Sequence, residues 1–154
     1  MRLVLPYPVS ANRYWAHGVV GRRGDRGHAV TFVTADAKRY RRQVKIAVVD
    51  QGLRRPFAHR VRVDLFLYPH RPLDWERRAR RDPLNWDDDV QCINLDNAWK
   101  VLMDALNGAV FVDDRWLWEQ GGKRMEPDDR GARVELEVAP VARETVQPKL
   151  FEAA

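Results

Sequence analysis

The most regular pattern in the chain lies between residues 59 and 68, where apolar and polar side chains alternate. The apolar positions are Val61, Val63, Leu65 and Leu67. Successive side chains of a strand point to opposite faces, so this alternation predicts a half-buried strand. The same pattern predicts a last strand over residues 132–138. Short apolar runs predict two further strands, over residues 2–5 and 29–33.

Two stretches repeat their apolar residues at helical spacing. Thr34 suits the cap of a helix over residues 35–49, and a second helix is expected over residues 96–107, ending at Asn107-Gly108. Strands outnumber helices and do not alternate regularly with them. The pattern therefore predicts one α+β domain over residues 1–139, with a mixed sheet and two main helices. Residues 140–154 are expected to form a flexible tail.

The connections carry three further expectations. Residues 69–90 predict a long polar connection, which in a compact domain is usually functional or disordered. Residues 115–124 predict a strand interrupted near Gly121-Gly122. The helix over residues 96–107 would be about 18 Å long, and residues 108–114 would span about 20 Å if extended. An antiparallel return strand would then bring Asp114 beside Asp96.

Composition narrows the class of protein. The 154 residues are 32% charged with a net charge of +5, and they hold one cysteine. No apolar run is long enough for a membrane span, and residues 1–6 lack the apolar segment of a signal peptide. A single cysteine excludes an internal disulfide framework and a cysteine-rich zinc site. The chain is therefore expected in a reducing cytoplasm.

The positive charge is mostly arginine. Only 5 of the 27 basic residues are lysine. The planar guanidinium group suits phosphate oxygens, so this excess favours a nucleic-acid partner. A GC-rich genome accounts for the same ratio equally well, so composition alone does not decide between the two.

Candidate chemistry lies on the second helix. Asp96, Lys100 and Asp104 recur every four residues and share one face. With Asp114 on a return strand, two carboxylates and a lysine would converge. Such a cluster suits Mg²⁺ beside a phosphate. A capped, solvated helix with ordinary ion pairs explains the same pattern, and from the residues alone it is the preferred interpretation.

A family resemblance changes that preference. The chain contains Asp96-Asn97, Lys100, Asp104-Ala105-Leu106 and Asp113-Asp114 in order. Near its N-terminus, residues 6–15 read PYPVSANRYW. This series resembles the signature of the RusA family of Holliday junction resolvases, over roughly residues 3–138. The resemblance implies a RusA-like fold and a small homodimeric, Mg²⁺-dependent endonuclease that cuts four-way DNA junctions by phosphodiester hydrolysis in recombination and repair.

The chain departs from the family pattern at Asn94, where the family has a metal-binding aspartate. Asparagine offers a neutral oxygen, which coordinates Mg²⁺ more weakly. Three interpretations follow. Asn94 serves as a weaker ligand, or one of residues 87–89 (with Asp89 among them) supplies the missing carboxylate, or the site binds DNA without cutting it. A working site with altered ligands is the favoured one.

The resemblance also implies roles for individual residues. Asp96 and Asp114, with Asn94, would hold Mg²⁺ (Mn²⁺ as a possible substitute), and Lys100 would stabilise transition-state charge. Asp113 ranks below Asp114 as a ligand, because neighbours on a strand face opposite ways. The rival function is a junction-binding architectural protein that does not cleave. A nuclease for other branched or flapped DNA is a third possibility.

Three groups of residues are candidates for binding partners. One group joins an arginine to aromatic rings that can stack on bases: Arg13, Tyr14 and Trp15. The two rings could equally pack under the sheet. A second group precedes the acidic helix: Arg77, Arg78, Arg80 and Arg81. The third resembles a peptide that docks on the bacterial sliding clamp, although so short a match also arises by chance: Gln147, Leu150 and Phe151.

Overall fold

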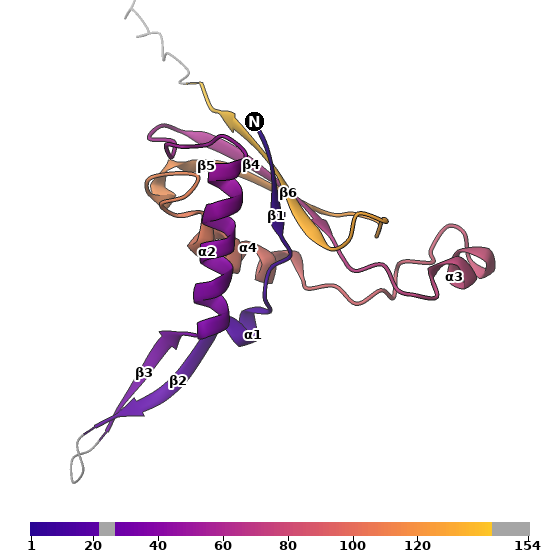
Figure 1. The fold of residues 1–154 in the computed structure, drawn as a ribbon, viewed down its shortest axis with the longest axis horizontal. Coiled ribbons are helices and arrows are strands. Elements are labelled where there is room, and N and C mark those ends of the chain that lie inside the picture. Colours follow the sequence, from indigo (N-terminus) through magenta and orange to yellow (C-terminus); the bar gives the residue numbers. More distant parts are fainter. Residues whose placement is uncertain (22–26, 143–154) are drawn as a thin grey trace, which may run out of the picture.

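The computed structural model describes residues 1–21 and 27–142 (Figure 1). Its main sheet has four strands in the order β1-β6-β4-β5. Their bounds are Arg2–Pro6 for β1, Arg133–Pro140 for β6, Val61–Tyr68 for β4 and Leu117–Arg124 for β5. β4 and β5 are parallel, whereas β6 runs antiparallel to both of its neighbours. The predicted mixed sheet is confirmed.

Two helices cover one face of this sheet and enclose the core (Figure 1). They are α2 (Ala35–Asp50) and α4 (Leu95–Leu106). Thr34 caps α2 as expected, its hydroxyl accepting from the Ala37 amide at 3.2 Å. The alternating apolar side chains of β4 are fully buried against the helices. The predicted α+β class, with two main helices, is confirmed.

Two elements extend from this body (Figure 1). One is an antiparallel ribbon of β2 (Trp15–Val20) and β3 (His28–Val33), entered through the short helix α1 (Ala11–Tyr14). The other is an arm that carries α3 (Trp75–Arg81) within the connection expected to be polar and irregular. No residue of α3 is buried. Ion pairs support this helix, because the Asp74 carboxylate at its start contacts Arg77 and Arg78 at 2.6 and 2.9 Å.

The return strand predicted over residues 108–114 is wrong. The chain instead folds into a tight loop at the end of α4, where the amides of Ala109 and Val110 donate to the Leu106 carbonyl at 2.9 and 2.8 Å. Val110 and Phe111 are buried there. Burial of these two side chains and the free carbonyl of the last helical turn favour the loop over an extended segment. A 3-10 turn, η1 (Asp114–Trp116), then leads into β5.

β5 runs without a break through its two glycines, so the predicted interruption is also wrong. A Cβ atom on Gly121 would lie 2.4 Å from Oδ1 of Asp64, and one on Gly122 would lie 3.0 Å from Nε1 of Trp99. The glycines therefore let side chains pack closely on both faces of the strand.

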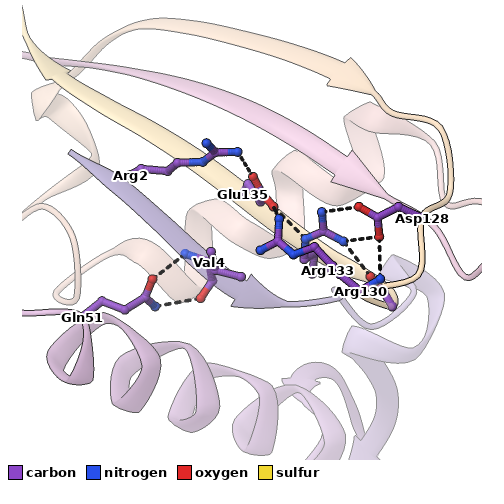
Figure 2. A network of polar contacts seen from close by, with 8 residues as sticks. Arg2, Val4, Gln51, Asp128, Arg130, Arg133 and Glu135 are labelled. Carbon is purple, nitrogen blue, oxygen red and sulfur yellow. Dashed lines mark hydrogen bonds and ion pairs between the residues drawn. The ribbon is translucent and has the colours of Figure 1, made fainter.

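The two edges of the sheet differ. At the β1 edge, the Gln51 side chain pairs with the backbone of Val4: Oε1 accepts from the amide at 2.7 Å, and Nε2 donates to the carbonyl at 2.8 Å (Figure 2). This amide occupies the position where a further strand would form hydrogen bonds. The outward-facing backbone groups of Val4, at the middle of the β1 edge, are thus paired within the chain.

A buried charge network lies on the sheet face away from the helices (Figure 2). Glu135 is 1% exposed and accepts from Arg2, from Arg133 at 2.7 Å and from Arg130 at 3.1 Å. Arg133 also makes two 2.7 Å bonds to Asp128. Burial raises the pKa of Glu135, but the bonds from Arg133 and Arg2 outweigh it and hold that pKa below its usual range. The Arg133 bond likewise lowers the pKa of Asp128.

Candidate functional site

The start of α4 presents polar side chains to solvent. Asn94 is the N-cap residue, yet its side chain makes no capping hydrogen bond. Nζ of Lys100 lies 3.4 Å from Oδ2 of Asp96, and the two side chains are 60% and 67% exposed. Asp96 and Lys100, two of the three residues expected to share a face, thus lie on the same side of α4. An exposed carboxylate, an uncommitted amide and an ammonium group therefore lie within about two turns of helix.

Contacts with Tyr7 hold the segment that leads into α4 in place. Tyr7 Oη accepts from the Ile93 amide at 3.1 Å and lies 3.5 Å from Sγ of Cys92. Burial and the contact with Cys92 raise the pKa of Tyr7 to about 12, so its hydroxyl stays protonated at neutral pH. This anchor fixes where Asn94 begins the helix.

A cavity of about 720 Å³ opens beside that start, between the body and the arm. Asn94 and Asn97 line one side, and Arg78 and Asp89 line another. Asp89 therefore does face the same space as Asn94. Its carboxylate is, however, 2.6 Å from Nη1 of Arg78, so in this structure it is committed to an ion pair.

Asp114 lies at the other end of α4. Gly122 of β5 packs against Leu95 and Trp99, in the first half of the helix, whereas the loop after Leu106 leads directly to η1. β5 therefore runs back along α4, and Asp114, which precedes it, stays near the helix C-terminus. The expectation that one chain brings Asp114 beside Asp96 is wrong. Within residues 1–21 and 27–142, no three His, Cys, Asp or Glu side chains cluster closely enough to hold a metal.

The neighbouring acids have structural contacts. Asp113 accepts from the Arg115 amide at 3.0 Å and caps η1. Asp104 accepts from the Tyr14 hydroxyl and lies 3.5 Å from Arg41. Burial, followed by the bond to Asp104, raises the pKa of Tyr14.

The three residues of the first candidate DNA-binding group lie in different environments. Tyr14 is fully buried, so its ring cannot stack on a base in this conformation, and for this residue packing under the sheet is the correct interpretation. Trp15 is half-buried against it, with ring centroids 4.6 Å apart. Arg13 is 74% exposed and pairs with Asp36 at 2.8 Å.

The arginines of the arm also differ from one another. Arg77 and Arg80 are each 82% exposed, and Arg81 is exposed as well. Arg78 is held between Asp74 and Asp89, with contacts of 2.9 and 2.6 Å. The arm thus presents three arginines to solvent and uses the fourth for its own structure.

Arg124 is a positioning residue that sequence reasoning missed. Its guanidinium group donates to the carbonyls of Asp87 and Val90, at 2.8 and 2.9 Å, and so fixes the root of the arm beside α4. No local pattern could have indicated a contact over more than thirty residues. The candidate clamp peptide, Gln147, Leu150 and Phe151, lies outside the described residues, so clamp binding stays a prediction.

Comparison with known proteins agrees with the resemblance. The family model for the endodeoxyribonuclease RusA matches residues 6–139. The chain belongs to the RusA family. The crossover junction endodeoxyribonuclease RusA of Escherichia coli strain K12 is 32% identical over 147 residues, which cover 92% of this chain and 96% of the relative. The RusA protein of Escherichia coli O139:H28, strain E24377A, is 31% identical over the same shares of the two chains.

The RusA match extends from the end of β1 into β6 and includes the whole of α4. It therefore covers the exposed Asn94, Asp96 and Lys100 as well as Asp114. Within the described residues, no helix is long and apolar enough to cross a bilayer.

Proposed function

We propose that this RusA-family protein is a structure-selective endonuclease that resolves four-way DNA junctions by paired, symmetric hydrolysis of phosphodiester bonds. The observation that carries the proposal is the exposed Asp96–Lys100 pair beside the uncommitted Asn94 side chain, in a chain whose relatives are named crossover junction endodeoxyribonucleases. The arm, which lines the same cavity through Arg78, carries the exposed Arg77 and Arg80, to which a DNA phosphate can bind.

The donor set supports a site shared between two copies. Asn94 and Asp96 offer an amide oxygen and a carboxylate at the start of α4, but Asp114 of the same chain lies at the far end of the helix. In a two-fold dimer, Asp114 of a second copy can complete each site, and two sites suit paired cuts. These oxygen donors fit Mg²⁺, with Mn²⁺ as a substitute. A cation held there would polarise the scissile phosphate and lower the pKa of the attacking water.

Lys100 supplies positive charge at the same site. Its ammonium group is 3.4 Å from Asp96 and mostly exposed, so it can turn from the carboxylate to a phosphate without loss of a buried contact. We propose that it stabilises the negative charge that develops on the phosphate in the transition state.

The second candidate function is a junction-binding protein that does not cleave. The neutral Asn94 side chain favours it, since one charged ligand fewer weakens cation binding. Incubation of the protein with a synthetic four-way junction and Mg²⁺ separates the two functions. We expect symmetric nicks that EDTA abolishes and that fall by at least about 100-fold in Asp96→Asn. Binding of the junction without nicks at any Mg²⁺ or Mn²⁺ concentration would support the second function instead.

Substitution of Asn94 tests the ligand position directly. We expect Asn94→Asp to lower the Mg²⁺ concentration needed for half-maximal nicking by roughly tenfold, because a charged oxygen binds the cation more tightly. The measurement is a Mg²⁺ titration of initial nicking rates.

Asn97→Asp is the matched control, since Asn97 lines the same cavity from the same turn of α4. It adds the same charge at a position not proposed as a ligand. An equal shift in both variants would mean that added negative charge alone, and not ligation by residue 94, sets the Mg²⁺ requirement.

A further inference from the structure

We propose that Asp89, carried by the arm, supplies the carboxylate that Asn94 lacks, and that Arg78 competes with the divalent cation for it. The inference rests on the proposed function in that a divalent cation is expected at the start of α4. It is argued from three features: the place of Asp89 in the cavity, the fixed backbone around it and the weak hold of its present ion pair.

The start of α4 offers little negative charge to a divalent cation. Asp96 is the acidic residue of its first turn, and the ammonium group of Lys100 lies 3.4 Å from that carboxylate. The neutral oxygen of Asn94 adds no charge. Since the affinity of a protein site for a hard divalent cation depends on the number of charged oxygen ligands, a further carboxylate would strengthen binding.

Asp89 faces the same space as Asn94. Residues 89–94 all line the cavity of about 720 Å³, together with Asn97 of α4. The segment therefore follows the cavity wall from Asp89 on the arm to Asn94 at the start of the helix. The Asp89 side chain is 72% exposed, so it can rotate toward α4 without repacking of the core.

The backbone on both sides of Asp89 is held in place. The guanidinium group of Arg124 donates to the carbonyls of Asp87 and Val90, at 2.8 and 2.9 Å. The Val90 amide donates to the Asp87 carbonyl at 3.1 Å and closes a turn, and the Val90 side chain is buried. Asp89 thus lies in a turn that β5 fixes beside α4, and only its side chain needs to move to reach a cation.

The ion pair that holds Asp89 can be exchanged at low cost. Nη1 of Arg78 lies 2.6 Å from the carboxylate, and among the described residues Arg78 is its only ion-pair partner. Because the carboxylate is mostly exposed, this pair contributes little to stability. Nε of Arg78 also lies 2.9 Å from Oδ1 of Asp74. A cation can therefore take Asp89 without leaving Arg78 unpaired.

Mn²⁺ binding in the absence of DNA tests Asp89 as a ligand. We expect Asp89→Asn to weaken Mn²⁺ binding by roughly tenfold, because it removes a charged oxygen ligand. Electron paramagnetic resonance of free Mn²⁺, in a titration of the full chain, gives the dissociation constant. Asp88→Asn is the matched control, since it removes the same charge from an exposed neighbour that is not among the residues lining the cavity.

A second substitution separates ligation from damage to the arm. Asn94→Asp, added to Asp89→Asn, should restore Mn²⁺ binding, because it returns a carboxylate to the start of α4. An arm that had merely unfolded would not be repaired by a change on α4. Failure of this restoration would overturn the exchange of roles between residues 89 and 94.

Arg78→Gln tests the competition. We expect it to tighten Mn²⁺ binding by about threefold, because it releases the Asp89 carboxylate. In an Asp89→Asn chain the same substitution should have no effect. Arg77→Gln is the matched control: it removes the same charge from α3 and a 2.6 Å contact with Asp74, but it leaves the pair of Arg78 with Asp89 in place.

The outcomes separate this inference from the proposed function, since the measurements need neither DNA nor cleavage. Equal Mn²⁺ affinities of the wild type and Asp89→Asn, or an equal loss in Asp88→Asn, would overturn Asp89 as a ligand. An effect of Arg78→Gln that persists in the Asp89→Asn chain would overturn the competition. A protein that binds Mn²⁺ through Asp89 but does not nick a junction would overturn only the proposed function.

Discussion

Mixing Asp96→Asn chains with Asp114→Asn chains is expected to restore the nicking of a four-way junction that neither variant performs alone. If each site takes Asp96 from one copy and Asp114 from the other, a mixed dimer concentrates both substitutions in one site and leaves the second intact. With random exchange of subunits, about a quarter of the wild-type number of sites should be active. Initial nicking rates of the mixture, compared with each variant alone, measure the effect.

The control is a mixture of Asp96→Asn with Asp96→Asn/Asp114→Asn chains, in which no intact site can form. It should stay inactive. If sites were built within single chains, both mixtures would be equally inactive, and that result would contradict the shared site. The mixed dimer should also cut one strand of the junction rather than two, which sequencing-gel analysis of each labelled strand can show.

Arg133→Met is expected to destabilise the protein by about 3 kcal/mol and to lower its Tm by about 10 °C. Arg133 is 6% exposed and donates to both Glu135 and Asp128, and its guanidinium group lies 3.8 Å from the Tyr68 ring centroid. Methionine fills much of the volume but leaves the Glu135 carboxylate buried with fewer donors. Urea unfolding and calorimetry measure the loss.

Arg130→Met is the matched control. Arg130 also donates to Glu135, at 3.1 Å, but its side chain is 58% exposed. Removal of such a contact should cost less than about 1 kcal/mol. Equal losses in the two variants would mean that burial of Arg133 adds nothing to the value of its contacts.

The pH dependence of stability should follow the same network. The pKa values of Glu135 and Asp128 are lowered in the folded protein, so their contribution is fully present above about pH 5 and is lost as pH falls through about 4 and below. In Arg133→Met the two carboxyl groups lose a shared donor, so the loss of stability on acidification should be smaller than in the wild type. Urea unfolding at a series of pH values gives both slopes.

Periodic sequence patterns predicted the body of the fold well. The alternation in β4 and the Thr34 cap of α2 both express local physics, namely the pleat of a strand and the free amides of a first helical turn. These sequence patterns gave wrong predictions where tertiary contacts determine the local structure. Residues 108–114 are long enough to reach back to Asp96 as a strand, but burial of Val110 and Phe111 against the core holds them in a loop. Helix α3 escaped notice because ion pairs to Asp74, rather than an apolar stripe, support it.

The candidate site was predictable in its residues but not in its geometry. The four-residue spacing of Asp96 and Lys100 fixed their contact, whereas the place of Asp114 depended on the path of a loop. The sequence also left open whether Tyr14 is buried, because an aromatic side chain that follows Arg13 can either pack in the core or stack on a DNA base. Its bond to Asp104, ninety residues away, decided for the core.

The side chain of Gln51 limits how far the sheet can grow. The Gln51 amide pairs with both outward-facing backbone groups of Val4, so another strand cannot pair there without displacing it. Were these two groups free, the β1 edge would offer a template on which a strand of another chain could pair. Gln51 thereby protects the edge of the sheet from self-association. We expect Gln51→Ala to self-associate, which light scattering at a series of protein concentrations can measure.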